Sequence, residues 1–170
     1  MRKILLLTLL LSILLSYSCS EDEPCNCTNK ITAAFIDSDG CKSFESETIL
    51  EDGYSRNVTA IRYDYDEELK LLKLKHFNAA FNCCVNRFYT EISVTGNKII
   101  VHEKADIDPC DCNCLFDLES HLSRIQPQTY YIQFVEGILH ENEPIFFEIN
   151  LKEKTSGEFT YQRNSSPWGM

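Results

Sequence analysis

The stretch that decides the fold is Cys110-Asp111-Cys112-Asn113-Cys114-Leu115-Phe116-Asp117-Leu118-Glu119-Ser120-His121-Leu122. Alternate side chains of an extended strand point to the same face of a sheet. The three cysteines therefore share a face with Phe116, Leu118, Ser120 and Leu122. The side chains that point the opposite way are those of Asp111, Asn113, Asp117, Glu119 and His121. This pattern predicts a strand whose apolar, core-facing side begins with a group of thiols.

The beginning of the chain has the layout of a secretory leader. Arg2 and Lys3 precede an apolar run over residues 4–15, which is too short for a membrane-spanning helix. We therefore predict that residues 1–18 are a signal peptide that is removed on export.

Cys19 stands directly after this leader. Residues 14–19 resemble a bacterial lipobox, and the acidic run that follows resembles the export tag of Bacteroidetes surface lipoproteins. The resemblance implies that Cys19 carries a thioether-linked diacylglycerol with acyl chains such as palmitate, which places the chain at the outer membrane or cell surface. Each buried methylene contributes roughly 0.8 kcal/mol, so several acyl chains anchor a protein stably in the membrane. The alternative is ordinary cleavage, after which Cys19 becomes one more disulfide partner.

The mature chain is strongly acidic. Loss of residues 1–18 removes two positive charges and no negative ones, so the formal charge changes from −10 to −12 over the remaining 152 residues. That length is enough for one domain with a hydrophobic core. An acidic surface repels phosphate backbones, which excludes nucleic acid as a partner.

Short alternating segments follow one another along most of the chain. We predict an acidic tether at 19–30, one domain at 31–163 and a tail at 164–170. No sustained helical pattern interrupts the domain, so the sequence predicts a single-domain antiparallel β-sandwich, with a small β-barrel as the alternative. The predicted strands lie at 31–36, 48–50, 58–65, 67–77, 88–95, 98–103, 110–122, 130–136, 145–151 and 158–163.

The clearest local signal is a hairpin around Gly96-Asn97. This pair suits a two-residue turn, and it sets Thr95 opposite Lys98 and Glu91 opposite His102. A slip of one residue would bury Glu91, so the register is strongly specified. We interpret Glu91 and His102 as a cross-strand pair on the surface.

A second local signal lies between Ile125 and Tyr130. The spacing is that of the corner found in many extracellular sandwich domains, where a tyrosine hydroxyl bonds back to the preceding turn. We therefore expect the Tyr130 hydroxyl to hold the 125–129 turn.

Cysteine usage points to an oxidising compartment. Nine cysteines less the lipidated Cys19 leave an even number, which in an exported chain suggests a disulfide framework. We expect at least one structural bond from the vicinal pair to Cys112 or Cys114, buried at the start of the core. Nearby aspartates, Asp108 and Asp111 among them, disfavour a thiolate and so a reactive thiol. The disulfide candidates are Cys25, Cys27, Cys41, Cys83, Cys84, Cys110, Cys112 and Cys114.

Two other chemistries remain open for these cysteines. Soft thiolates and an imidazole suit zinc, although zinc ligands are usually spaced by two or more residues. A redox-active vicinal disulfide at Cys83-Cys84 is the other option. The alternative metal ligands would be Cys83, Cys84, Cys112, Cys114 and His76, whereas the preferred interpretation includes no metal and no cofactor.

The segment His76-Phe77-Asn78-Ala79-Ala80-Phe81-Asn82-Cys83-Cys84, a hairpin, Cys110-x-Cys-x-Cys-x-Phe-Asp-Leu and Tyr130-Tyr131-Ile132 form a recognisable pattern. It resembles a family of small uncharacterised surface lipoproteins of the Bacteroidetes type. The resemblance covers about residues 70–135 and is specific in its cysteine spacing. The resemblance implies a location at the cell surface and a fold, and it implies no activity.

The remaining candidate residues carry weaker signals. We interpret 37–40 as a turn in preference to a calcium loop, because the downstream glutamate is misplaced. His76, His102, His121 and His140 are scattered along the sequence. The acidic residues of a predicted solvated edge are Asp64, Asp66, Glu67 and Glu68, and the aromatic residues that could form a ligand platform are Tyr54, Tyr63, Tyr65 and Trp168.

The sequence favours a non-catalytic binding module over an enzyme. It lacks the nucleophile-elbow, zinc-protease, phosphate-loop and dinucleotide motifs. We therefore expect a surface module that binds a glycan, a peptide or another envelope protein. A metal-binding or thiol-redox protein is the alternative, and a hydrolase with paired carboxylates is a third hypothesis.

Overall fold

Nine β-strands make up the regular structure of the described residues, which are 30–42, 53–108, 110–137 and 145–163 of the computed structural model. The chain separates into two units, Met1–Lys30 and Ile31–Met170, and every one of these strands belongs to the second. The predicted leader, Cys19, the 48–50 strand and the 164–170 tail lie outside the described residues. The strands are β1 (Thr32–Ser38), β2 (Val58–Asp66), β3 (Leu71–Asn82), β4 (Val85–Thr95), β5 (Lys98–Ile107), β6 (Asn113–Ser123), β7 (Thr129–Val135), β8 (Ile145–Asn150) and β9 (Ser156–Gln162).

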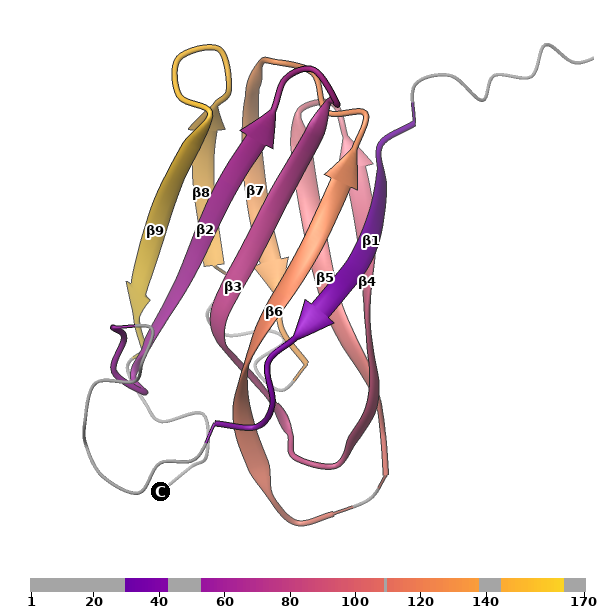
Figure 1. The fold of residues 1–170 in the computed structure, drawn as a ribbon, viewed down its shortest axis with the longest axis vertical. Helices are drawn as coiled ribbons and strands as arrows, with labels where there is room; N and C mark the ends of the chain where they lie inside the picture. Colours follow the sequence, from indigo (N-terminus) through magenta and orange to yellow (C-terminus); the bar gives the residue numbers. More distant parts are fainter. Residues whose placement is uncertain (1–29, 43–52, 109, 138–144, 164–170) are drawn as a thin grey trace, which may run out of the picture. The chain divides into compact units, whose positions relative to one another are not determined.

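The strands form two sheets that pack face to face (Figure 1). The five-stranded sheet has the order β1-β6-β3-β2-β9, and the four-stranded sheet has the order β4-β5-β7-β8. This arrangement confirms the predicted β-sandwich. Among the described residues we find no helix that is long and apolar enough to cross a membrane.

One neighbouring pair of strands runs parallel. β5 and β7 lie side by side with Ile99 opposite Ile132 and Val101 opposite Phe134. The intervening strand, β6, belongs to the other sheet. The chain therefore crosses the sandwich after β5, runs back along β6 and returns at the end where β5 began, so that β7 starts beside the start of β5. All other strand pairs are antiparallel, as predicted.

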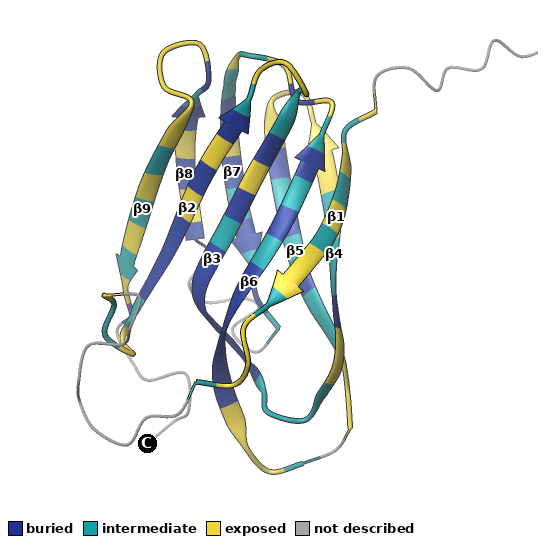
Figure 2. Cartoon of the chain, viewed as in Figure 1, coloured by how far each residue is buried: buried dark blue, intermediate teal, exposed yellow. Residues whose placement is uncertain are grey.

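Alternation along the strands builds the core. Buried and exposed residues follow one another along β2, β7 and β8 (Figure 2), because alternate side chains face the opposing sheet. The larger hydrophobic cluster includes Ile61, Leu74 and Ile132, all fully buried. A smaller cluster around Phe81 and Phe116 lies towards the cysteines.

The central stretch differs in two ways from its prediction. β6 begins only at Asn113, so Cys110 and Cys112 lie in the preceding loop and are not part of the strand. Asp117, expected to face solvent, is buried. Its Oδ1 accepts hydrogen bonds from the Asn78 backbone N–H at 3.0 Å and pairs with Lys42 Nζ at 2.5 Å. The positive charge of Lys42 therefore compensates the buried carboxylate. This contact lies at the bulge in β3, where the register between β3 and β6 shifts.

The boundary before β3 also differs. Residues 67–70 form a turn and not the start of a strand, and Lys70 adopts a φ of 52° there. The predicted strand is present from Leu71 onwards, where Leu72, Leu74 and His76 alternate with more exposed residues.

The hairpin has the predicted register. Thr95 pairs with Lys98, and Glu91 pairs with His102 on the outer face of the four-stranded sheet. Gly96 has a φ of 61°, the left-handed conformation that a two-residue hairpin turn requires and that glycine adopts without strain.

The tyrosine corner is also confirmed. The Tyr130 hydroxyl accepts a hydrogen bond from the Gln126 N–H at 3.0 Å. The Tyr65 hydroxyl donates to the Ile125 carbonyl at 3.0 Å from the opposite sheet. Two buried tyrosines thus satisfy the backbone of one turn.

We predict that Tyr130→Phe lowers the free energy of unfolding by about 1 kcal/mol, because the Gln126 N–H loses its acceptor while the packing of the ring is retained. Urea denaturation at neutral pH measures the change. The matched control is Tyr131→Phe, on the outer face of the same strand, which should leave stability unchanged. Equal effects of the two substitutions would contradict the role of the corner.

Candidate functional site

Four charged side chains meet inside the sandwich. His76 lies on β3 and Glu103 on β5, while Glu136 and Arg163 directly follow β7 and β9. Each occupies the next inward position after an alternating apolar row, such as Ile99 and Val101 before Glu103. Because these rows end at the same level of the sandwich, the four side chains converge between the two sheets.

His76 is the centre of this cluster. Its Nδ1 lies 2.6 Å from Glu103 Oε2, and its Nε2 lies 2.8 Å from Thr59 Oγ1 and 3.3 Å from Glu136 Oε1. The Thr59 hydroxyl donates its single proton to the Phe77 carbonyl at 3.0 Å, so Thr59 accepts from Nε2. Nε2 therefore donates to Thr59, and Nδ1 donates to Glu103 when that group is a carboxylate, which makes His76 an imidazolium.

Glu136 links this histidine to the other half of the cluster. Its Oε1 accepts from Arg163 Nη2 at 2.7 Å, and its Oε2 accepts from the Ala80 N–H at 3.1 Å. Arg163 Nη2 also donates to the Asn78 carbonyl at 2.9 Å. Two cations and two carboxylates thus share one interior site, and their formal charges cancel.

The pKa values follow from burial and from these partners. Burial alone would lower the pKa of His76, but the charge and hydrogen bond of Glu103, reinforced by Glu136, raise it to about 9. Burial raises the pKa of Glu103 above its usual range, although His76 opposes that shift. Burial acts in the same direction on Glu136, but there His76 and Arg163 prevail and lower the pKa.

The cluster is closed to solvent. His76 is 0% exposed, both glutamates are 4% exposed, and the ring of Phe134 packs edge-on against the imidazole. A general acid or base must come within hydrogen-bonding distance of its substrate, and none of these groups has an open side. The arrangement therefore serves to join the sheets. Within the described residues, the Arg163 Nε is the buried side-chain nitrogen that lacks a partner.

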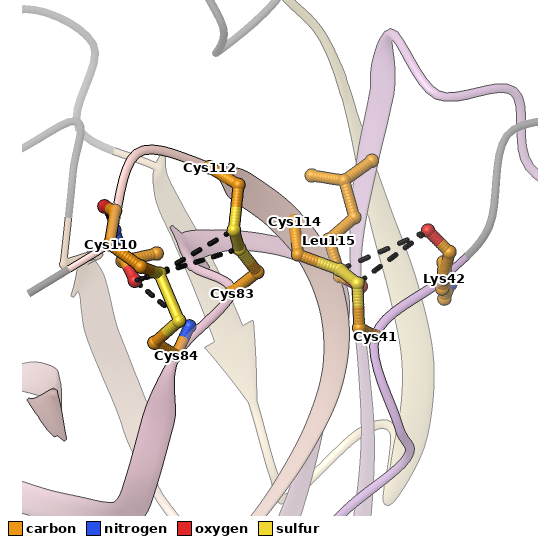
Figure 3. The surroundings of a disulfide bond; sticks show 9 residues. Cys41, Lys42, Cys83, Cys84, Cys110, Cys112, Cys114 and Leu115 are labelled. Atoms are coloured by element: carbon orange, nitrogen blue, oxygen red, sulfur yellow. Dashed lines mark hydrogen bonds between the residues drawn. A yellow bond between two sulfur atoms is a disulfide. The ribbon is translucent and has the colours of Figure 1, made fainter. Parts of the chain in front are cut away.

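The six cysteines of the described residues form three disulfides, which are Cys41–Cys114, Cys83–Cys112 and Cys84–Cys110 (Figure 3). The bond from Cys83 to Cys112 confirms the expected link between the vicinal pair and the alternating run. Cys19, Cys25 and Cys27 lie outside the described residues.

The setting of these bonds differs from the prediction. The Cys83–Cys112 and Cys84–Cys110 bonds join two loops at the end of the sandwich, where Cys112 is exposed and the other three cysteines are half-buried. The expected position at the start of the core is occupied by Cys114, which is 1% exposed and bonded to Cys41. The apolar face of β6 therefore begins with one cysteine, in a disulfide, and not with three.

The alternative metal-ligand set is not brought together. His76 is held in the charged cluster, and Cys114 is bonded to Cys41. A different group of four sulfur atoms, from Cys83, Cys84, Cys110 and Cys112, lies within 4.8 Å of one another. Cys110 is the member that the alternative metal set had omitted.

The aromatic residues proposed as a platform lie elsewhere. Tyr63 and Tyr65 are buried, 4% and 5% exposed, and Tyr54 packs against the Phe77 ring. Trp168 lies outside the described residues. The three tyrosines therefore form no exposed platform.

Two other aromatic side chains lie on the outer face of the four-stranded sheet. Tyr131 on β7 is 37% exposed and Phe146 on β8 is 49% exposed. Their rings are parallel to within 4°, with centroids 6.2 Å apart. They are diagonal neighbours, because Tyr131 pairs with Glu148 and Phe146 pairs with Gln133. Tyr131 follows the buried Tyr130 directly on β7, so its side chain points to the outer face. This alternation could have predicted an exposed aromatic side chain at position 131.

The other candidates are dispersed. Asp64, Glu67 and Glu68 are exposed and Asp66 is half-buried around the β2–β3 turn, as expected of a solvated edge. His121 contacts Glu119 at 2.8 Å on β6, and His140 lies outside the described residues. Residues 37 and 38 belong to the end of β1, which extends two residues beyond its prediction.

Comparisons of the chain with protein-family models, with curated proteins and with solved structures find no match.

We predict that the free energy of unfolding falls by about 3 kcal/mol between pH 6.5 and pH 9. A pKa of His76 raised to about 9 in the folded protein means that its contribution is complete below the unfolded value of 6.5 and is lost as pH rises through 9. Urea titrations at a series of pH values measure the decline.

The matched variants are His76→Gln, which should flatten this pH dependence, and His102→Gln on the outer face of β5, which should retain it. A free energy of unfolding that stays constant over this interval in the unsubstituted chain would show that His76 is neutral when folded.

Proposed function

We propose that this chain is a lipid-anchored binding module of a bacterial cell envelope, which recognises a glycan through the outer face of its four-stranded sheet. The observation that carries the proposal is the exposed, parallel pair of Tyr131 and Phe146.

The aromatic pair suits a ligand that is apolar on one face and polar at its rim. A sugar ring packs its C–H face on an aromatic ring and offers hydroxyl groups to neighbouring donors and acceptors. Gln133 and Glu148 stand opposite the two aromatic residues, and Lys98 pairs with Tyr131 on the β5 side. This composition provides amide, carboxylate and ammonium groups around two rings.

A protein partner fits this surface less well. A stable protein interface covers about 800 Å² on each partner and has a core depleted of charge. Here the charged side chains of Lys98 and Glu148 lie directly beside Tyr131 in the pairing register. The apolar area is therefore divided into a small patch, which favours a small amphipathic ligand.

A binding role is also consistent with the interior. The titratable residues that resemble a catalytic group, His76, Glu103 and Glu136, are enclosed between the sheets and satisfied by one another. Chemistry at this cluster would require the sandwich to open.

The proposed location at the cell envelope rests on the leader, on the lipobox-like segment that ends at Cys19 and on the resemblance to surface lipoproteins. The three disulfides support it, because such bonds persist in exported proteins and are rare in the cytosol. In this proposal the acidic residues after Cys19 form the tether between the lipid and the domain.

We predict that Tyr131→Ala combined with Phe146→Ala weakens glycan binding at least ~30-fold, which corresponds to about 2 kcal/mol for loss of a central aromatic anchor. A glycan array of envelope and extracellular polysaccharides identifies the ligand, and titration calorimetry measures its Kd. The unfolding temperature should fall by only a few degrees, because both side chains lie on the outer face of the sheet and the double variant loses roughly 1 kcal/mol of cross-strand contact.

The matched control is Leu69→Ala, which removes an exposed apolar side chain at the β2–β3 turn, 69% exposed. It should bind as the unsubstituted chain does. Binding of a protein without any glycan, or equal binding by the double variant, would contradict the proposal.

We further predict that Cys19→Ala moves the chain from the detergent phase to the aqueous phase of a Triton X-114 partition. The reason is that the lipid thioether forms only on the cysteine sulfur. Cys25→Ala is the control and should remain in the detergent phase. Full partition of the Cys19 variant into detergent would exclude a lipid anchor at this residue.

A further inference from the structure

The loops at one end of the sandwich bring four cysteine sulfur atoms into a single group. Cys83 and Cys84 lie between β3 and β4, and Cys110 and Cys112 lie between β5 and β6 (Figure 3). All four sulfur atoms are within 4.8 Å of one another. The Cys110 sulfur is not bonded to those of Cys83 and Cys112, yet it lies only 3.7 Å and 3.5 Å from them.

Hydrogen bonds hold these loops together independently of the disulfides. The Cys83 N–H donates to the Cys112 carbonyl at 3.1 Å, and the Asp108 N–H donates to the Cys84 carbonyl at 2.9 Å. The Asn82 amide donates to the Cys110 carbonyl at 2.8 Å, while its oxygen accepts from the Cys84 N–H at 2.9 Å. The backbone that presents the sulfur atoms is therefore fixed by contacts that survive reduction.

The spacing of the sulfur atoms is close to that of a metal site. Four thiolates around Zn²⁺, each at about 2.3 Å in a tetrahedron, lie about 3.8 Å from one another. The two contacts of the Cys110 sulfur, at 3.7 Å and 3.5 Å, already have this length. To complete the tetrahedron the two bonded pairs must separate, while the sulfur atoms of the other pairs already lie within 4.8 Å of one another.

We propose that reduction of the Cys83–Cys112 and Cys84–Cys110 disulfides converts this group into a four-thiolate site for a soft d¹⁰ cation, represented by Zn²⁺. Each disulfide takes two electrons and two protons from a dithiol reductant, which is itself oxidised to a disulfide. The four thiols formed then release four protons as Zn²⁺ binds, and the resulting complex has a charge of −2.

The exposure of the cysteines allows this conversion. Cys112 is exposed and its three neighbours are half-buried, so a reductant and an ion can reach them. Cys114, by contrast, is 1% exposed and belongs to the core. The exposed carboxylates of Asp108 and Asp111 flank the loop and favour a cation over free thiolates.

The test uses the full chain, reduced with a phosphine under anaerobic conditions and titrated with Co²⁺ and then Zn²⁺. We expect one Co²⁺ per chain with the visible bands of tetrahedral thiolate coordination, displacement of the cobalt by one Zn²⁺, and no binding to the oxidised chain. Absence of stoichiometric binding after reduction would overturn the proposal.

Substitutions assign the binding to these four residues. Cys83→Ser combined with Cys112→Ser should abolish the tetrahedral spectrum. The controls Cys41→Ser with Cys114→Ser, and Cys25→Ser with Cys27→Ser, should retain it. A spectrum that survives the first pair, or that is lost with either control while circular dichroism shows an intact sheet, would overturn the assignment.

A second measurement covers the case in which reduction or a substitution unfolds the chain. A ligand that binds only the folded state shifts the folding equilibrium towards it. Zn²⁺ should therefore restore the β-sheet circular dichroism of the reduced chain, or raise its unfolding temperature, and leave that of the oxidised chain unchanged. A reduced chain that remains unfolded with Zn²⁺ would contradict the site.

Discussion

The buried imidazolium of His76 is the interaction on which the sandwich depends. It extends from the five-stranded sheet to Glu103 of the four-stranded sheet at 2.6 Å, and to Glu136 at 3.3 Å. Each glutamate alone would be an uncompensated interior charge, and the removal of one partner from such a group typically costs 3–5 kcal/mol. Because Arg163 balances the second carboxylate, the cluster is neutral as a whole. The two sheets are therefore joined by charged hydrogen bonds as well as by apolar packing.

Much of the fold could be predicted from local sequence patterns. Alternation located most strands, and Gly96-Asn97 set the hairpin register that the structure has. The turn to Tyr130 was predicted from spacing alone and is present as a hydrogen bond. These features depend on neighbours in sequence or on a single strand pair, so the residues themselves carry the information.

The charged cluster was not predicted, although its signal exists. Glu103 continues the inward row of Ile99 and Val101, and His76 continues that of Leu72 and Leu74. A charge at such a position is ordinarily assigned to the surface, because burial is unfavourable until its partner is known. The partners here come from strands of different sheets, so no local pattern reveals them.

The prediction of the cysteine pairing was limited for a related reason. The alternation of Cys110, Cys112 and Cys114 suggested one continuous strand, but β6 begins only at Asn113. The first two cysteines instead follow a loop that places them against Cys83 and Cys84. The path of a loop depends on both of the strands that it joins, and the sequence of one strand does not define it.

The Cys41–Cys114 bond has a mechanical consequence. If a ligand pulls on the domain against a lipid at Cys19, the force enters at the beginning of β1, which is an edge strand paired only with β6. An edge strand pulled from its end peels away one hydrogen bond at a time. Cys41, just beyond the far end of β1, is covalently bonded to β6, so peeling stops there. The load then passes to β6, an interior strand that is hydrogen-bonded on both sides, where many hydrogen bonds must break together.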